Sequence, residues 1–217
     1  MNLLIAAATD KELEAVKRHC IANNSTTIRL LTTGVGSVAS CFTFTDEIAK
    51  QSPDLIIQIG IAGSFSNDLS IGSAVAVSHE IIADMGVIEA DGYKNIFQLG
   101  LAQPDIFPYS NGALVNTHHE LFRMTGMKMV IGVTVNEITT QPEKISLFSN
   151  EYGAEVESME GAALHYVGIM KKIPFIQIRG ISNSVGERDK SKWKINEAIA
   201  SASDACIELI NNLMTRS

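Results

Sequence analysis

Apolar runs of strand length alternate with amphipathic segments of helix length along most of the chain. The apolar runs predict strands near residues 2–8, 27–33, 54–60, 73–79, 129–133, 155–159 and 174–179. Apolar positions at helical spacing predict helices over residues 10–21, 37–50 and 194–214. Because strands and helices alternate in this way, we expect an α/β fold: a three-layer αβα sandwich around a mixed, mostly parallel central sheet.

One region breaks this alternation. Glycine, proline and aspartate recur through residues 83–116, which predicts loops that run over the face of the sheet. No repeat, low-complexity tract or linker divides the chain, and 217 residues suit one large core better than two small ones. We therefore expect a single domain over residues 1–217.

Composition excludes several classes of function. The hydrophobic fraction is 46%, yet no apolar run approaches the eighteen or so residues of a membrane span. The apolar opening lacks a basic leader, so we expect a first core strand rather than a signal peptide, and a cytoplasmic protein. The net charge of −7 and the lack of a basic cluster argue against nucleic acid as a partner. Three widely spaced cysteines fit neither a disulfide framework nor a zinc site.

Two glycine-rich segments follow predicted strands. Gly34 and Gly36 partly match a dinucleotide fingerprint, but no acidic residue near position 60 would hold a ribose, so a tight turn is the better interpretation. In residues 60–64, small residues that include Ala62 and Gly63 would let a flat ligand touch the main chain. We expect no cofactor.

The histidine and serine motifs of common hydrolases are missing. Neither His79 nor the pair His118 and His119 completes the His-Glu-x-x-His pattern of a zinc site, so we expect no metal. No Gly-x-Ser-x-Gly elbow is present to carry a serine nucleophile. His165 is interpreted as a packed or half-exposed histidine rather than a catalyst.

The remaining candidates for chemistry are acids. They lie after predicted strands or in the irregular region, and for each a solvated surface position is the default interpretation. These acids are Glu12, Asp84, Asp91, Glu157 and Glu160. Glu12 and Glu160 stand out because each follows a buried strand where an α/β sheet places its ligand. Asn183 occupies the corresponding place after the strand near 174–179.

Taken together, these segments resemble the purine nucleoside phosphorylase and nucleosidase superfamily, and within it the nucleosidase branch. The resemblance covers nearly the whole chain, in order, at residues 7–12, 33–36, 59–63, 84–86, 156–163 and 178–183. It implies an N-glycosidic hydrolase that acts on a small-molecule nucleoside. Relatives of this kind are commonly homodimers, so the resemblance also implies a homodimer.

The resemblance assigns roles at the sugar. It implies that Glu12 orders and deprotonates an attacking water with help from Arg179. It also implies that Glu160 grips the ribose hydroxyls while Met159 packs beside the sugar. An oxocarbenium-like transition state suits this arrangement, because a carboxylate beside the ribose stabilises the charge and a separate base activates the water.

The resemblance also assigns residues around the base. Ala62 and Gly63 would lie against the purine, with Ser182 and Asn183 at its edge. Trp193 stands where relatives have a phenylalanine that closes over the base or the 5′ substituent. Nucleosidases that cleave methylthioadenosine and adenosylhomocysteine carry aspartate at the position of Asn183. An asparagine instead complements hypoxanthine, because it offers a donor to the 6-oxo group and an acceptor to a protonated N7.

Within the branch, residues 83–86, 91–93 and 182–189 resemble 6-oxopurine nucleosidases that release hypoxanthine from a precursor of menaquinone. That precursor carries a benzoate on its 5′ side. Lys94, Arg123 and Arg188 are available to receive its charge, and the sequence singles out none of them. The alternatives are a methylthioadenosine/adenosylhomocysteine nucleosidase, a phosphorylase and a non-catalytic relative. Phosphorolysis is disfavoured because the first loop offers Lys11 but no arginine, and Glu12 would repel phosphate.

Overall fold

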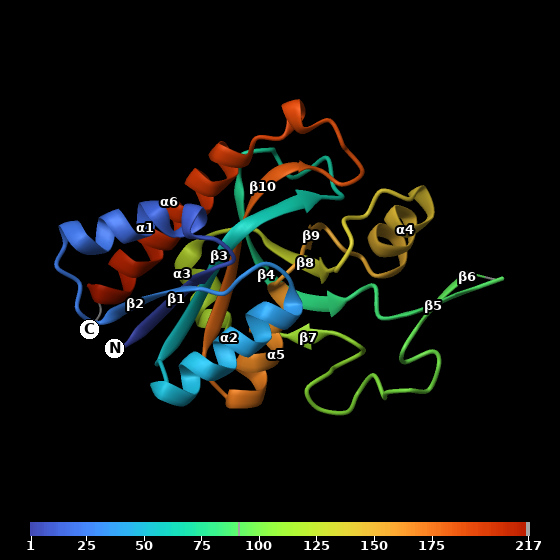
Figure 1. Cartoon of the computed structure of the whole chain (residues 1–217), viewed down its shortest axis with the longest axis horizontal. Coiled ribbons are helices and arrows are strands. Elements are labelled where there is room, and N and C mark those ends of the chain that lie inside the picture. The colour runs from blue at the N-terminus through green and yellow to red at the C-terminus, as the bar shows by residue number, and fades with distance from the viewer. Residues whose placement is uncertain (91, 216–217) are drawn as a thin grey trace.

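The computed structural model describes residues 1–90 and 92–215 as a sheet with helices on both faces (Figure 1). The strands are β1 (Leu3–Ala7), β2 (Ile28–Thr32), β3 (Leu55–Ser64), β4 (Ala74–Ile82), β5 (Gly86–Glu89), β6 (Gly92–Asn95), β7 (Leu114–Val115), β8 (Met129–Thr134), β9 (Val156–Ser158) and β10 (Phe175–Ser184). The helices are α1 (Asp10–Ala22), α2 (Ser37–Lys50), α3 (His119–Thr125), α4 (Pro142–Ser146), α5 (Gly161–Lys171) and α6 (Ile195–Met214). A π-helical turn, η1 (Leu147–Glu151), follows α4, and a 3₁₀ turn, η2 (Lys190–Lys192), precedes α6.

The large sheet is mixed and mostly parallel, as predicted. Its strands run in the order β10-β4-β8-β9-β3-β1-β2, and β10 also pairs with β3, so five strands close on themselves. The pairs β1–β2, β1–β3, β10–β3, β4–β8 and β8–β9 are parallel, whereas β10–β4 and β3–β9 are antiparallel. This closure brings the ends of β3, β9 and β10 together at one edge.

Alternate side chains along the buried strands belong to two separate hydrophobic cores. Leu3, Ile5 and Ala7 of β1 pack with α1 and α6 on one face. Leu4 and Ala6 of the same strand pack with α2 and α5 on the other face. Successive side chains of a strand point to opposite faces, so a strand that is apolar throughout must be covered on both sides. The predicted three-layer sandwich is confirmed.

The irregular region contains more structure than the sequence predicts. The interpretation of residues 83–116 as loops alone is wrong, because β5 and β6 form an antiparallel hairpin and β7 pairs with β4. The hairpin requires a glycine at position 86, where an added Cβ would lie 2.2 Å from the Lys94 carbonyl oxygen. These strands are too short and too exposed to produce an alternating pattern.

Asp91, one of the candidate acids, lies outside the described residues. Within the described residues, no helix is long and apolar enough to cross a membrane.

Candidate active site

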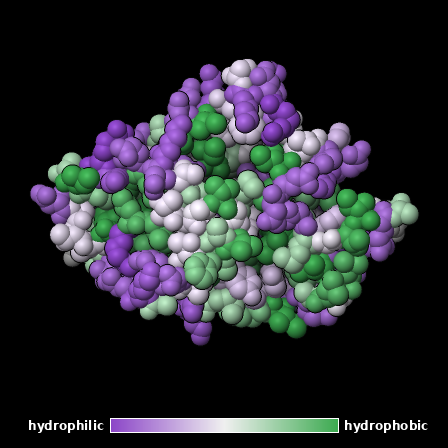
Figure 2. All heavy atoms as spheres, viewed as in Figure 1, coloured by the Kyte–Doolittle hydropathy of each residue, from purple (hydrophilic) through white to green (hydrophobic). Residues whose placement is uncertain are grey.

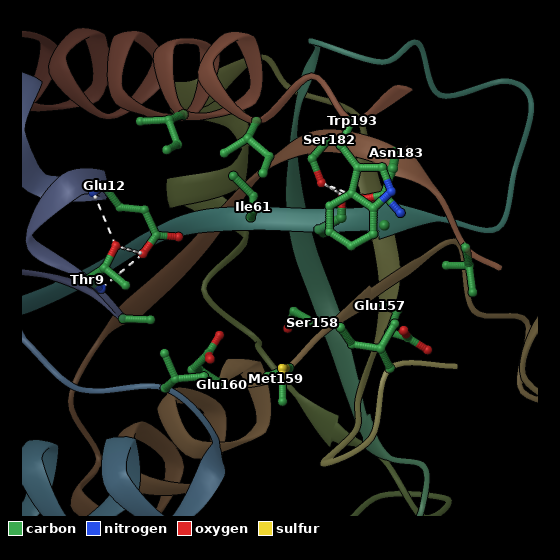
Figure 3. A pocket seen from close by; sticks show the side chains of 18 of the residues that line it. Thr9, Glu12, Ile61, Glu157, Ser158, Met159, Glu160, Ser182, Asn183 and Trp193 are labelled. Carbon is green, nitrogen blue, oxygen red and sulfur yellow. Dashed lines mark hydrogen bonds between the residues drawn. The ribbon is translucent and has the colours of Figure 1, made fainter. Parts of the chain in front are cut away.

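A cavity of about 430 Å³ opens where β1, β3, β9 and β10 end. In the space-filling view a hollow lies below the segment that follows β10, with apolar residues on its walls (Figure 2). Every predicted site residue except Arg179 lines the cavity, namely Glu12, Ala62, Gly63, Met159, Glu160, Ser182, Asn183 and Trp193. Glu12 lies on one side and Asn183 with Trp193 on the other, while Met159 and Glu160 lie across from both (Figure 3). Sequence segments far apart in the chain therefore meet at one site.

Glu12 is fixed by the first turn of α1. Thr9 caps the helix, and its backbone NH and hydroxyl donate to Glu12 Oε2 at 3.0 and 2.7 Å. This reciprocal capping satisfies backbone groups that a helix start leaves free. It consumes one carboxylate oxygen and leaves the other available, on a side chain that is only 8% exposed. The carboxylate is thus held rigidly at the wall of the cavity.

Glu160 is held by two other segments. Its Oε1 accepts a hydrogen bond of 3.0 Å from the backbone NH of Gly36, and its Oε2 lies 3.7 Å from Arg179 Nη1. Gly36 has φ +89°, a left-handed conformation that favours glycine. The glycine turn that the sequence indicated therefore serves to aim an NH group at a carboxylate.

Arg179 does not line the cavity but lies beneath it. Its guanidinium donates to Gln58 Oε1 at 3.1 Å and is 2% exposed. The guanidinium lies against Gly60. A Cβ added at Gly60 would lie 2.2 Å from Arg179 Nη1 and 3.3 Å from Glu12 Oε1. Arg179 is thus positioned to act on Glu12 and Glu160 from below.

A β-bulge sets the residues at the other side of the cavity. The pairing of β10 with β3 shifts between Ile181 and Asn183, so Ser182 has no partner in the register. The extra residue allows two consecutive side chains, Ser182 and Asn183, to line the same cavity. Ser182 Oγ donates to Asn183 Oδ1 at 2.7 Å, and Asn183 Nδ2 donates to the carbonyl of Ser184 at 2.8 Å. The amide is therefore fixed in one orientation.

Trp193 closes this side of the cavity. Its indole NH donates to the carbonyl of Glu187 at 3.0 Å, which ties the segment after β10 to the start of α6. The ring lies over the part of the cavity next to Ser182 and Asn183 (Figure 3). A flat ligand between Trp193 and the small residues of β3 would be covered on both faces.

Of the remaining candidate acids, Asp84 lies outside the cavity and Glu157 lines it. Asp84 lies outside the cavity, where its carboxylate accepts hydrogen bonds from Asn136. Glu157, interpreted as a surface acid, is 7% exposed and lines the cavity. Burial raises its pKa, an effect that the Thr139 amide and hydroxyl partly oppose. Glu157 lies between two buried residues of β9. A strand of three residues is too short for the sequence to show which of its side chains point inward.

A fourth buried acid, Glu80 of β4, was not among the acids that the sequence singled out. Its Oε1 accepts from the Thr134 hydroxyl at 2.7 Å, and Thr134 in turn accepts from the NH of Ala162 at 2.8 Å. A Cβ at Gly161 would lie 2.5 Å from Glu80 Oε2, so the carboxyl group abuts the start of α5. Burial raises the pKa of Glu80 to about 7. This acid therefore supports the helix that begins directly after Glu160.

His165 and the three candidate cations do not line the cavity. His165 is fully buried, with Nδ1 2.9 Å from the Leu114 carbonyl oxygen, and burial lowers its pKa to about 4. None of Lys94, Arg123 and Arg188 lines the cavity. Among the described lining residues, Lys11 is the only lysine or arginine.

Comparison with known proteins places the chain in a family. The model of the Phosphorylase superfamily matches residues 6–214, and the chain therefore belongs to that superfamily. The futalosine hydrolase of Streptomyces coelicolor is 30% identical over 94% of this chain and 93% of its own length. That of Thermus thermophilus is 29% identical over 83% of this chain and 80% of its own length.

Solved structures share the fold. The native futalosine hydrolase of Helicobacter pylori superimposes with a TM-score of 0.78 and 15% identity, covering 97% of each chain. A mutant methylthioadenosine nucleosidase of the same organism, with 5′-methylthioadenosine in its active site, superimposes with a TM-score of 0.80 and 15% identity. That comparison covers 97% of this chain and 98% of the other. At this identity the likeness establishes the architecture alone.

Proposed function

We propose that the protein is a nucleosidase that hydrolyses the N-glycosidic bond of futalosine and releases hypoxanthine. The observation that carries the proposal is Asn183, a neutral amide fixed at the part of the cavity where Gly63 and Trp193 would enclose a flat base. The similarity to two futalosine hydrolases over most of the chain supports the same substrate. We call this part, with Gly63, Glu157, Asn183 and Trp193, the base end.

The part formed by Glu12, Glu160 and Arg179 is the sugar end. Glu160 binds the ribose hydroxyls and stabilises the positive charge that develops on the sugar as the bond breaks. The free oxygen of Glu12 orders a water molecule and takes its proton, with the Arg179 guanidinium beneath. Met159 packs against the ribose. Hydrolysis rather than phosphorolysis follows, because a phosphate here would face two carboxylates.

At the base end, Asn183 stabilises the leaving group. Its NH₂ donates to the 6-oxo group of the purine and its carbonyl accepts the proton carried by N7. Ser182 holds the amide in that orientation. Adenine would present an amino group where the amide also offers donors, so the site favours a 6-oxopurine.

The 5′ side of futalosine ends in a benzoate. The 5′ substituent extends from the ribose away from the base, toward the part of the cavity lined by Thr9, Lys11 and Val35. Lys11 is exposed there, and its ammonium group receives the carboxylate. Lys11, which the sequence analysis assigned to the first loop and the structure places in the first turn of α1, thus has a use that the sequence did not reveal.

A phosphate-free assay of the purified protein on futalosine, inosine and methylthioadenosine tests the proposal. We expect futalosine to be cleaved with the highest kcat/KM and to yield hypoxanthine. Dominant cleavage of methylthioadenosine would establish the rival nucleosidase instead. A requirement for phosphate would establish a phosphorylase, and no turnover of any nucleoside would leave a non-catalytic relative.

We further propose that the protein is a homodimer. Large apolar side chains are exposed around the start of α2 and in the segment after β6, including Val38, Phe42, Leu101, Ile106 and Phe107. Exposed apolar patches of this kind are typical of protein interfaces. Val35 is also exposed and lines the cavity, so a partner subunit on this face would border the 5′ side. Light scattering after size exclusion should report twice the mass of one chain.

The product and the thiols suggest where the protein works. Hydrolysis of futalosine leaves dehypoxanthine futalosine, an intermediate of menaquinone biosynthesis. Cys20 and Cys206 are buried and unpaired, which suits a reducing compartment. We place the reaction in the cytoplasm; fractionation of the native host would test this.

A further inference from the structure

A fully buried carboxyl group lies beneath the sugar end, and two glycines make room for it. Glu80 of β4 is 0% exposed. A Cβ added at Gly132 of β8 would lie 2.7 Å from Glu80 Oε2, and one added at Gly161 of α5 would lie 2.5 Å from the same atom. Both neighbouring elements thus leave space for this carboxyl group, although its burial as a charge would be costly.

Hydrogen bonds connect this acid to the start of α5. Thr134 donates its hydroxyl hydrogen to Glu80 Oε1 at 2.7 Å, and the same hydroxyl oxygen accepts from the NH of Ala162 at 2.8 Å. That NH is one of the groups that a helix start leaves without a partner in the helix. Glu160, the N-cap residue of α5, lies two positions before Ala162. Glu80 therefore acts on the segment that carries Glu160.

The charge state of Glu80 matters because one guanidinium serves both acids. Burial raises the pKa of Glu80 to about 7, although the Thr134 hydroxyl and the Arg179 guanidinium favour the carboxylate; the charge of Glu160 adds to the rise. Arg179 Nη1 also lies 3.7 Å from Glu160 Oε2. An ionised Glu80 would thus be a second buried carboxylate that competes for the same cation.

The histidines around Glu80 stay neutral where it titrates. Gln177 of β10 interacts with both Glu80 and His165 of α5, and burial lowers the pKa of His165 to about 4. Burial also lowers the pKa of His79, which precedes Glu80 on β4. Both imidazoles are therefore neutral at the pH where Glu80 loses its proton. Of these three groups, Glu80 alone changes charge there.

We propose that Glu80 is a positioning residue for the hydrolysis: in its protonated form it holds the start of α5 and leaves the charge of Arg179 to Glu160. The proposal rests on the proposed function, since it assigns Glu160 to the ribose. When Glu80 ionises, its carboxylate attracts Arg179 and repels Glu160, so stabilisation of the cationic sugar weakens. Turnover should then fall as pH rises through about 7, although Glu80 does not line the cavity.

Carboxyl-carbon NMR of protein labelled in glutamate tests the coupling without substrate. The Glu80 signal, identified by its absence from Glu80→Gln, should titrate at about pH 7. The Glu160 signal, identified in the same way from Glu160→Gln, should move with the same midpoint and show no such step in Glu80→Gln. Thr134→Val lacks the hydroxyl that favours the carboxylate, so the Glu80 midpoint should rise by about one pH unit, and Thr134→Ser should restore it.

Activity on futalosine provides a readout that a merely structural role would not change. The ratio of kcat/KM of Glu80→Gln to that of the wild type should rise roughly tenfold between about pH 6 and 8.5, because the amide cannot ionise. Loss of support for α5 alone would give a ratio independent of pH. If Glu80→Gln fails to fold, Thr134→Val provides the comparison, and its ratio should rise in the same direction. Glu120→Gln, the same change at an exposed acid of α3, is the control and should give a flat ratio.

The outcomes separate this proposal from the proposed function. A Glu80 signal that titrates near its ordinary value of 4.5, a Glu160 signal that does not follow the Glu80 midpoint, or a flat activity ratio in the folded variants would overturn the role of Glu80. A wild type that cleaves no nucleoside would overturn the proposed function instead. The NMR titration uses no substrate, so it decides the coupling of Glu80 to Glu160 in either case.

Discussion

The sugar end and the base end of the cavity are built in different ways. At the sugar end, Glu12 and Glu160 are buried acids that the protein itself holds in place: Thr9 holds Glu12, and Gly36 and Arg179 hold Glu160. At the base end, the group that faces the base is a neutral amide, Asn183, which Ser182 and Ser184 hold. The sugar end therefore presents carboxyl groups to the substrate, whereas the base end presents a neutral amide.

This difference separates reaction from selection. Charges that must meet a developing cation work best when they are fixed in advance, because no reorganisation is then needed in the transition state. Groups that choose between two bases work best when a wrong base leaves them unsatisfied. Variants of the sugar end should therefore lower turnover of every substrate, and variants of the base end should change which substrate is used.

The largest effect is expected for Glu12→Gln. Loss of the base that activates water removes about 3–4 kcal/mol of transition-state stabilisation, which lowers kcat by roughly a hundredfold or more. Steady-state assays should show this loss equally for futalosine and inosine, with the fold intact. Glu14→Gln, an exposed acid one position beyond Leu13 on α1, is the control. A loss confined to one of the substrates would contradict the assignment of Glu12 to the sugar end.

Glu80→Gln examines the layer beneath the sugar end. The unfolded chain releases the Glu80 proton near pH 4.5, whereas the folded protein holds it to about pH 7. The stability of the wild type therefore falls relative to Glu80→Gln as pH rises through this window, by an amount that reaches about 3 kcal/mol. Denaturant unfolding of both proteins at pH 4.5, 6 and 8 measures the difference, from which other titrations cancel. A difference independent of pH would refute it.

Asn183→Asp should alter the choice of base. The carboxylate opposes the 6-oxo group of hypoxanthine, so kcat/KM for inosine should fall by about ten- to a hundredfold and that for adenosine should fall less. Asn150→Asp, the same change at an exposed amide, provides the comparison. If both nucleosides lost activity equally, Asn183 would belong with the sugar end in function.

Lys11→Met should give the smallest effect. An exposed ion pair contributes about 0.2–1 kcal/mol, so KM for futalosine should rise roughly two- to fivefold while inosine, which lacks the carboxylate, is unaffected. Lys17→Met on the exposed face of α1 is the matched control. An unchanged KM for futalosine would show that the benzoate finds its cation elsewhere.

Sequence patterns predicted the fold well where burial is two-sided. The strand at Leu3–Ala7 and the helix at Ser37–Lys50 were located within one or two residues, because apolar runs and helical spacing respond directly to burial. The β5–β6 hairpin was missed because its residues are largely exposed and carry no alternating pattern. Short, solvated strands are held by pairing, which a single sequence does not display.

The site was predicted less evenly. Glu12 and Glu160 were found because each follows a buried strand, and the structure brings both to one cavity. Arg179, predicted to assist Glu12, does not itself line the cavity but lies against Gly60 below it, and its role stays a prediction. Glu80 was not a candidate, and Glu157 was a candidate with a surface position as its default interpretation, because the burial of both depends on which strands become neighbours. That pairing is a property of topology, not of local pattern.

The bulge at Ser182 has a wider meaning for β10. Successive side chains of a strand normally point to opposite faces of the sheet. A single unpaired residue reverses the face to which every later side chain of the strand points. Ile181 therefore belongs to one phase of the strand and Asn183 to the other. Regular pairing through this point would instead set Ser182 opposite Gly63 and turn the Asn183 amide to the face of Ile181, without changing any side chain. The selectivity of this protein thus depends on the number of residues in β10 before Asn183 as much as on their identity.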